Sequence, residues 1–149
     1  MIVLGLVLVL GAFQIGRESS SHQPPTTTSS RGTSITTPVL RENFTLLACS
    51  QSNTLGLEGC AEHHIVALDK QINELRRQVF SLLRVVSARR SFVNGELSWT
   101  SYRSSFCLSA SSVYQGGTLA PVAFATCLVQ ADQRHLSALR ELAQQLSHP

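Results

Sequence analysis

Charged residues are scarce in this chain, and lysine is almost absent. Only 14% of its 149 residues are charged, and Lys70 is the only lysine among twelve basic residues. The formal net charge is +3. Nucleic-acid-binding proteins concentrate basic residues on one face and interleave aromatic residues among them. A charge this small argues against that class, so we expect no nucleic-acid partner.

The patterns that indicate a bound metal or a catalytic centre are also missing. The four cysteines include no Cys-x-x-Cys pair, which would pre-organise thiolate ligands for zinc. Cys60, His63 and His64 are neighbours, but the two histidines point in different directions on a helix and no carboxylate motif completes a metal site. No serine occupies a strained nucleophile turn. We expect no metal, no cofactor and no enzymatic activity.

A long apolar span is lacking as well. Residues 1–13 form a nearly unbroken apolar run, whereas a helix that crosses a bilayer needs roughly 20 residues. No Lys or Arg precedes the run and no Ala-x-Ala site follows it. We expect residues 1–16 to be a signal peptide, with a short membrane anchor as the alternative. The protein would then be periplasmic or secreted, or held at the membrane by this segment.

Residues 17–44 are dominated by serine, threonine and proline. Such a composition lacks the apolar density that offsets the entropy cost of ordering a chain. We expect a disordered linker. Asn43-Phe44-Thr45 is formally a glycosylation acceptor, but a solvated spacer is favoured over a sugar-bearing stalk.

Three helical patterns and no convincing strand follow in residues 45–149. Apolar residues recur at alternating spacings of three and four along the first, which predicts a helix over 58–87. Aromatic residues mark a second helix over about 90–110, and a third follows the loop 111–120, with Pro121 in its first turn. The stripes comprise Ile65, Leu68, Ile72, Leu75, Val79, Leu82 and Val86; Phe92, Trp99, Tyr102 and Phe106; and Phe124, Leu128, Ala131, His135, Leu139, Leu142 and Leu146. We predict a small all-α, three-helix domain.

The four cysteines lie where the predicted helices join, at Cys49, Cys60, Cys107 and Cys127. An even number in an exported domain predicts disulfides, and four cysteines allow three connectivities. We favour Cys49 with Cys60 and Cys107 with Cys127, because each pair closes a short loop. Loops of about 11 and 20 residues would each contribute roughly 3 kcal/mol in the chain-entropy model.

Polar residues on the helical stripes predict a contact between helices. Asp69 follows Leu68 at the edge of the first stripe, and Arg103 stands four residues after Trp99 on the second. A charge-assisted pair beside the indole would fix the helix register. We predict a structural clamp of Asp69, Trp99 and Arg103, and a binding site is the alternative. For His135 a packed, hydrogen-bonded core position is favoured over a pH-sensitive contact to Asp69 or Glu96.

From Cys49 to about Leu142 the chain resembles the lysozyme inhibitor LprI-like N-terminal domain family. The residues that carry the resemblance are Cys49, Glu58, Cys60, Leu68-Asp69, Glu96, Trp99, Tyr102-Arg103, Cys107, Gly116-Gly117-Thr118, Cys127-Leu128 and Leu139. The resemblance implies a small, exported, disulfide-bearing helical protein that binds lysozyme or resides in the bacterial envelope. Most members of the family have no established activity.

Two surfaces are candidates for the partner. The first is the loop 109–118 between Cys107 and Cys127, with Tyr114, Gln115, Gly116, Gly117 and Thr118. A disulfide-closed loop loses less entropy on binding, and we expect it to enter a cleft on lysozyme or another cell-wall hydrolase. The alternative is a non-inhibitory protein that binds an anionic polymer or membrane through an arginine flank. That flank comprises Arg76, Arg77, Arg84, Arg89 and Arg90. The sequence does not indicate an oligomeric state.

Overall fold

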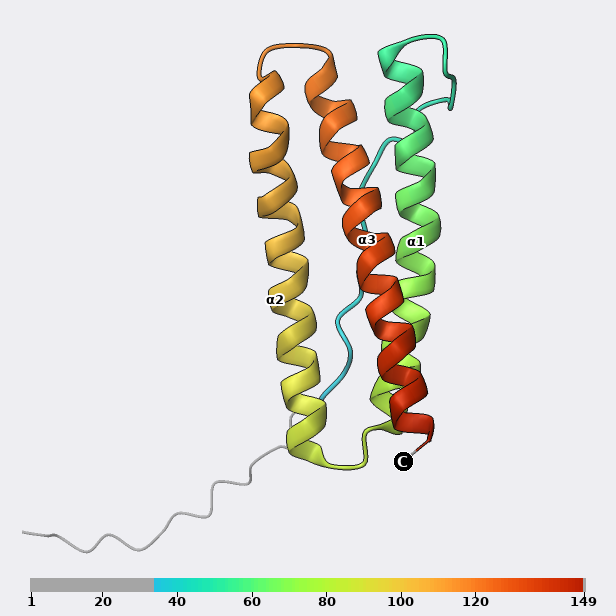
Figure 1. Cartoon of the computed structure of the whole chain (residues 1–149), viewed down its shortest axis with the longest axis vertical. Helices are drawn as coiled ribbons and strands as arrows, with labels where there is room; N and C mark the ends of the chain where they lie inside the picture. The colour runs from blue at the N-terminus through green and yellow to red at the C-terminus, as the bar shows by residue number, and fades with distance from the viewer. Residues whose placement is uncertain (1–33, 149) are drawn as a thin grey trace, which may run out of the picture. The chain divides into compact units, whose positions relative to one another are not determined.

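The computed structural model describes residues 34–148 (Figure 1). Its helices are α1 (Thr54–Leu82), α2 (Val86–Ser111), the short 3₁₀ helix η1 (Ser112–Tyr114) and α3 (Leu119–Ser147). No strand occurs in residues 34–148, and the predicted all-α class is confirmed. The predicted leader, residues 1–16, and most of the predicted linker lie outside the described residues.

The helix boundaries differ from the predicted ones by a few residues. Helix α1 begins four residues earlier than expected because the Asn53 side chain caps it, accepting a hydrogen bond from the Gly56 N–H at 2.8 Å. It ends at Leu82 because Leu83 is extended, so Val86 belongs to α2 and not to the first stripe. The predicted loop 111–120 is mostly helical, since it contains η1 and the start of α3.

An extended segment lies between α1 and α2, visible in Figure 1 as the cyan trace. We call residues 38–47 the strap. The Leu40 N–H donates to Asn73 Oδ1 at 2.8 Å, and Asn73 Nδ2 donates back to the Leu40 carbonyl at 2.7 Å. Farther along, the Leu47 N–H donates to Glu62 Oε2 at 3.0 Å. The strap therefore runs antiparallel to α1 and is held by side chains of that helix.

The strap corrects the predicted linker, which extended to residue 44. Leu40 is only 3% exposed and belongs to the main core cluster, and Phe44 packs against a second cluster. The packed part of the chain therefore begins before Thr45. Polar side chains of α1 satisfy backbone groups of the strap, which is why ordering is possible for a segment without a strand partner.

Two apolar clusters fill the space between the helices and the strap. Helix α3 contacts both α1 and α2. The first cluster contains Leu40, Leu68, Ile72, Val79, Leu136, Leu139 and Ala143, and the second contains Ile65, Cys107, Ala125 and Leu128. No α-helix within residues 34–148 is sufficiently long and apolar to cross a bilayer.

Both disulfides have the favoured connectivity. Cys49 is joined to Cys60 and Cys107 to Cys127, and no cysteine is free. The first bridge ties the segment before α1 to the first third of that helix. The second ties the end of α2 to the beginning of α3. Both bridges therefore lie near the end of the domain where α1 and α3 begin (Figure 1).

Substitutions at two glycines test how closely the segment before α1 approaches that helix. A Cβ on Gly59 would lie 2.7 Å from the Ala48 carbonyl oxygen and 2.8 Å from that of Leu47, whereas a Cβ on Gly95 would meet nothing within 4 Å. We expect Gly59→Ala to lower the free energy of unfolding by about 1–3 kcal/mol through overpacking. Gly95→Ala, inside α2, should raise it by about 0.5–1 kcal/mol. Urea denaturation measures both; equal effects of the two substitutions would contradict the close approach at Gly59.

Candidate functional site

Six charged residues form two neighbouring ionic centres between the strap and the three long helices. We call them the buried ionic cluster; it consists of Glu42, Asp69, Arg76, Glu96, Arg103 and Asp132. The side chains of Arg76, Arg103 and Asp132 have no exposed surface, and those of Asp69 and Glu96 are 7% exposed. Buried charges are costly unless each is paired, so the geometry of this group decides whether the helices fit together.

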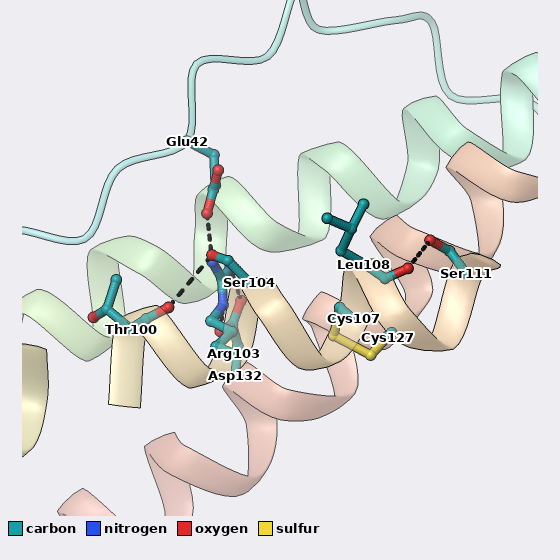
Figure 2. Close-up of a disulfide and its surroundings, with 9 residues drawn as sticks. All are labelled: Glu42, Thr100, Arg103, Ser104, Cys107, Leu108, Ser111, Cys127 and Asp132. Carbon is teal, nitrogen blue, oxygen red and sulfur yellow. Dashed lines mark hydrogen bonds and ion pairs between the residues drawn. A yellow bond between two sulfur atoms is a disulfide. The ribbon is translucent and has the colours of Figure 1, made fainter. Parts of the chain in front are cut away.

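Arg103 lies at the centre of the cluster. Its Nε and Nη2 donate to Asp132 Oδ1 and Oδ2 at 2.5 and 2.7 Å, a bidentate pair between α2 and α3. Its Nη1 donates to Glu42 of the strap, and Asp69 Oδ1 of α1 lies 3.7 Å from Nη2. Figure 2 shows Glu42 and Asp132 meeting the guanidinium one turn before the Cys107–Cys127 disulfide. One side chain thus joins the strap and all three long helices.

Arg76 forms a second centre, toward the other end of α1. Its Nε donates to Glu96 Oε2 at 2.5 Å, and its Nη2 donates to Thr100 Oγ1 at 3.2 Å. Its Nη1 donates to the Pro38 carbonyl at 3.4 Å. Arg76 therefore links α1, α2 and the strap and is not part of an exposed arginine flank, which corrects the sequence prediction.

Trp99 and His135 lie between the two arginines. Their rings stack with centroids 3.7 Å apart, and His135 Nε2 lies 2.8 Å from Glu96 Oε2. The guanidinium carbons of Arg76 and Arg103 are 5.5 and 5.9 Å from the indole centroid, within the range of cation–π attraction. His135 is a packed core histidine, as favoured, and its polar contact is to Glu96.

The predicted trio of Asp69, Trp99 and Arg103 is brought together, but the sequence analysis missed the strongest partners. Asp132 occupies the buried stripe of α3 between Leu128 and Leu136, a spacing of four on each side that could have revealed it. Glu42 gave no such signal, because it belongs to the strap.

Burial and charge shift the carboxyl groups in different directions. Burial raises the pKa of Asp69 to about 6; the positive charge of Arg103 opposes this rise, and the nearby Asp132 and Glu42 add to it. Burial also raises the pKa of Asp132 despite its bonds to Arg103. For Glu96, burial is outweighed by His135 and Arg76, so its pKa is lowered. Asp69 Oδ1 is also buried without a hydrogen-bond partner, which makes Asp69 the least satisfied member of the cluster.

The arginines of the cluster bond to groups within the domain. Among residues 34–148, no group of three or more His, Cys, Asp or Glu side chains is arranged to hold a metal ion. The arrangement is suited to fixing helix register, and a structural role for Asp69, Trp99 and Arg103 stays our interpretation. Exposed apolar residues are also found at the two ends of the helices.

One end is the α2–α3 tip, which we define as residues 108–119. It contains the predicted partner-binding residues Tyr114, Gln115, Gly116, Gly117 and Thr118. Val113 is 78% exposed and Tyr114 46% exposed. The Gly117 N–H donates to the Tyr114 carbonyl at 2.9 Å, and Gly116 has φ of 81°, a conformation that favours glycine.

A cleft lies beside the tip, on the first three turns of α3. Its volume is about 320 Å³, and its lining consists of Tyr114, Leu119, Val122, Ala123, Thr126, Cys127 and Gln130. Residues 104–131 contain no Asp, Glu, Lys, Arg or His. The tip and its cleft are therefore uncharged, apolar in large part, and held by the Cys107–Cys127 bridge.

The other end is the α1–α2 turn. Arg84 and Arg90 are exposed there, together with Val85 and Val86, whereas Arg89 is half-buried. Arg77 is exposed and pairs with Glu74 on the surface of α1. With Arg76 buried, the exposed cations of the predicted flank are Arg77, Arg84 and Arg90.

Comparison with known proteins identifies one family. A family model described as lysozyme inhibitor LprI matches residues 48–139. The match includes all four cysteines and the tip, and it begins after the strap. No curated protein and no solved structure matches the chain significantly.

The ionic cluster predicts a large cost for removing its central cation. Arg103→Ala leaves Asp132 and Glu42 without their partner, and we expect the free energy of unfolding to fall by about 3–5 kcal/mol. Arg134→Ala removes an exposed arginine of α3 and should change it by less than about 0.5 kcal/mol. Urea denaturation of both variants checks this. Similar small losses would show that the cluster does not hold the helices together.

Asp69 predicts a pH dependence. Since its pKa is raised from 3.8 to about 6 in the folded state, protonated Asp69 contributes stability that is present below about pH 3.8 and is lost as pH rises through about 6. Because asparagine does not ionise, Asp69→Asn should raise the melting temperature above that of the native chain by more at pH 7.5 than at pH 4. The melting temperature at both pH values measures this, with Glu74→Gln as an exposed control. A parallel shift in all three proteins would contradict the burial of an ionisable Asp69.

Proposed function

This chain belongs to the lysozyme inhibitor LprI family, and on that basis we propose that it binds lysozyme or another cell-wall hydrolase through its α2–α3 tip. The observation that carries the proposal is the exposed, uncharged tip with its adjoining cleft. Exposed apolar groups gathered at one end of a small domain are typical of a protein-binding surface.

The construction of the tip supports this assignment. Helices α2 and α3, bridged by Cys107–Cys127, hold the connection at both sides. A segment held in this way loses little conformational entropy when a partner binds. Tyr114 combines an exposed ring with a position at the rim of the cleft, and tyrosine is enriched among residues that dominate binding energies.

The absence of charge at the tip bears on the kind of partner. Rim charges mainly steer association and suppress partners of like sign. A tip without charged residues neither repels nor selects a partner by the sign of the partner's charge. Complementarity at the tip therefore depends on shape and apolar contact. We infer that the tip would fill an apolar depression, such as the substrate cleft of a hydrolase.

The environment follows from the disulfides and the family. Two disulfides with no free cysteine suit an extracytoplasmic protein. We propose that the protein is periplasmic or secreted, and that residues 1–16 serve as its export signal or as a short membrane anchor. Since the matching family is described as inhibitors, we propose that the chain acts by binding and has no catalytic activity of its own.

Inhibition of lysozyme tests the proposal directly. We expect the purified protein at micromolar concentration to slow lysis of a cell-wall substrate. Tyr114→Ala should raise the concentration needed for half-inhibition about tenfold or more, the usual consequence of truncating a dominant contact residue. Tyr102→Ala is the matched control, because Tyr102 is 62% exposed on α2 but lies outside the tip.

Two results would contradict the proposal. Unchanged activities of lysozyme and other cell-wall hydrolases in the presence of the native protein at that concentration would remove the inhibitory function. Equal weakening of inhibition by Tyr114→Ala and Tyr102→Ala would show that the contact does not lie at the tip.

A further inference from the structure

The α1–α2 turn has a charge pattern of its own. Between Glu74 and Glu96 the chain carries five arginines and no acidic residue, and Glu96 is buried against Arg76. Two apolar side chains stand among the exposed cations at the turn, since Val85 and Val86 are each 61% exposed. The turn therefore presents to solvent an exposed apolar pair flanked in sequence by Arg84 and Arg90.

Contacts of Arg89 within the domain stabilise the turn. Arg89 Nε donates to the Leu83 carbonyl at 2.7 Å, and its guanidinium carbon lies 4.9 Å from the Phe80 ring centroid. Arg89 thus ties the first turn of α2 back to the end of α1. Arg89 thereby holds in place the start of α2, where Val85 and Val86 lie, while Arg84 and Arg90 are exposed.

The turn lies at the opposite end of the helices from the tip (Figure 1). Helix α3 has 29 residues, so the two ends are separated by about 43 Å at 1.5 Å per residue. The strap passes Asn73 at Leu40 and Arg76 at Pro38. The first residues of the strap therefore lie toward the turn end of the domain.

We propose that the α1–α2 turn is a membrane-contact surface that binds anionic lipid head groups. Arg84 and Arg90 would contact the phosphates, and Val85 and Val86 would enter the interfacial region. A basic residue close to an anionic membrane surface strengthens binding about fivefold, and apolar side chains add a contribution that does not depend on lipid charge. The tip would then face away from the bilayer. This surface goes beyond the proposed function and does not depend on it.

Co-sedimentation with lipid vesicles tests the surface. The full chain is mixed with vesicles of phosphatidylcholine alone, or of equal parts phosphatidylcholine and phosphatidylglycerol. The ratio of the two partition coefficients cancels the charge-independent contribution of residues 1–16. We expect the native chain to prefer the anionic vesicles and to lose this preference at high salt. Arg84→Gln with Arg90→Gln should reduce the ratio about 25-fold, from fivefold per arginine.

Matched variants separate the turn from the rest of the surface. Val85→Ser with Val86→Ser should weaken binding to both kinds of vesicle and leave their ratio nearly unchanged. Arg134→Gln with Arg140→Gln removes two exposed arginines of α3 and should leave the ratio within about twofold of native. Val113→Ser at the tip should leave vesicle binding unchanged. Lysozyme inhibition by the turn variants should equal that of the native chain. Failure of the membrane proposal is therefore distinguishable from failure of the proposed lysozyme binding.

Several results would overturn the membrane assignment. Equal partitioning of the native chain into both vesicles would do so, as would a similar loss in the α3 arginine variant. Arginine-dependent binding to soluble polyglutamate without binding to vesicles would identify an anionic polymer as the partner. Dimers in sedimentation velocity that Val85→Ser with Val86→Ser dissolves, without any vesicle binding, would assign the turn to self-association.

Discussion

The pairing of the buried Arg103 guanidinium is the interaction on which the rest of the structure depends. Arg103 is held by both oxygens of Asp132 and by Glu42, with Asp69 nearby. A buried cation has no substitute for these partners, because water cannot reach it. Any shift of the strap, α1 or α3 along α2 would leave a charge unpaired. Apolar contacts in the two core clusters would tolerate some sliding of one helix along another. The ionic cluster does not, and it therefore fixes the register of the helices.

The register of the helices sets the positions of the two ends of the domain. The disulfides lie toward the tip end and Arg76 lies toward the turn end, with the Arg103 centre between them. The tip is an uncharged connection held by a disulfide, whereas the turn is a basic connection held by contacts that include those of Arg89. A rigid rod with chemically different ends suits a protein that holds one partner away from another surface. The family match supports the binding role, and the charge pattern supports the orientation.

The helices and the disulfide pairs could be predicted from the sequence, but the strap and much of the ionic cluster could not. Regular spacing revealed Ile65, Leu68, Ile72 and Val79, which are buried in α1. The strap follows directly on a stretch rich in serine, threonine and proline, and its hydrogen bonds go to side chains, so no period of two marks it. Arg76 was assigned to a solvated flank because arginine is usually exposed. Arg76 follows Ile72 by four residues and precedes Val79 by three, which places it on the buried stripe of α1. The interpretation as part of an exposed flank gives more weight to its charge than to this position.

A double-mutant cycle between Arg103 and Asp132 tests the central claim most directly. The free energies of unfolding of the native chain, Arg103→Met, Asp132→Leu and the double variant give the coupling energy of the pair. We predict a coupling of at least about 2 kcal/mol, because each single substitution leaves one buried charge unpaired and the double substitution leaves none at this pair. A coupling near zero, with additive losses, would contradict the claim that this pairing fixes the arrangement of the helices.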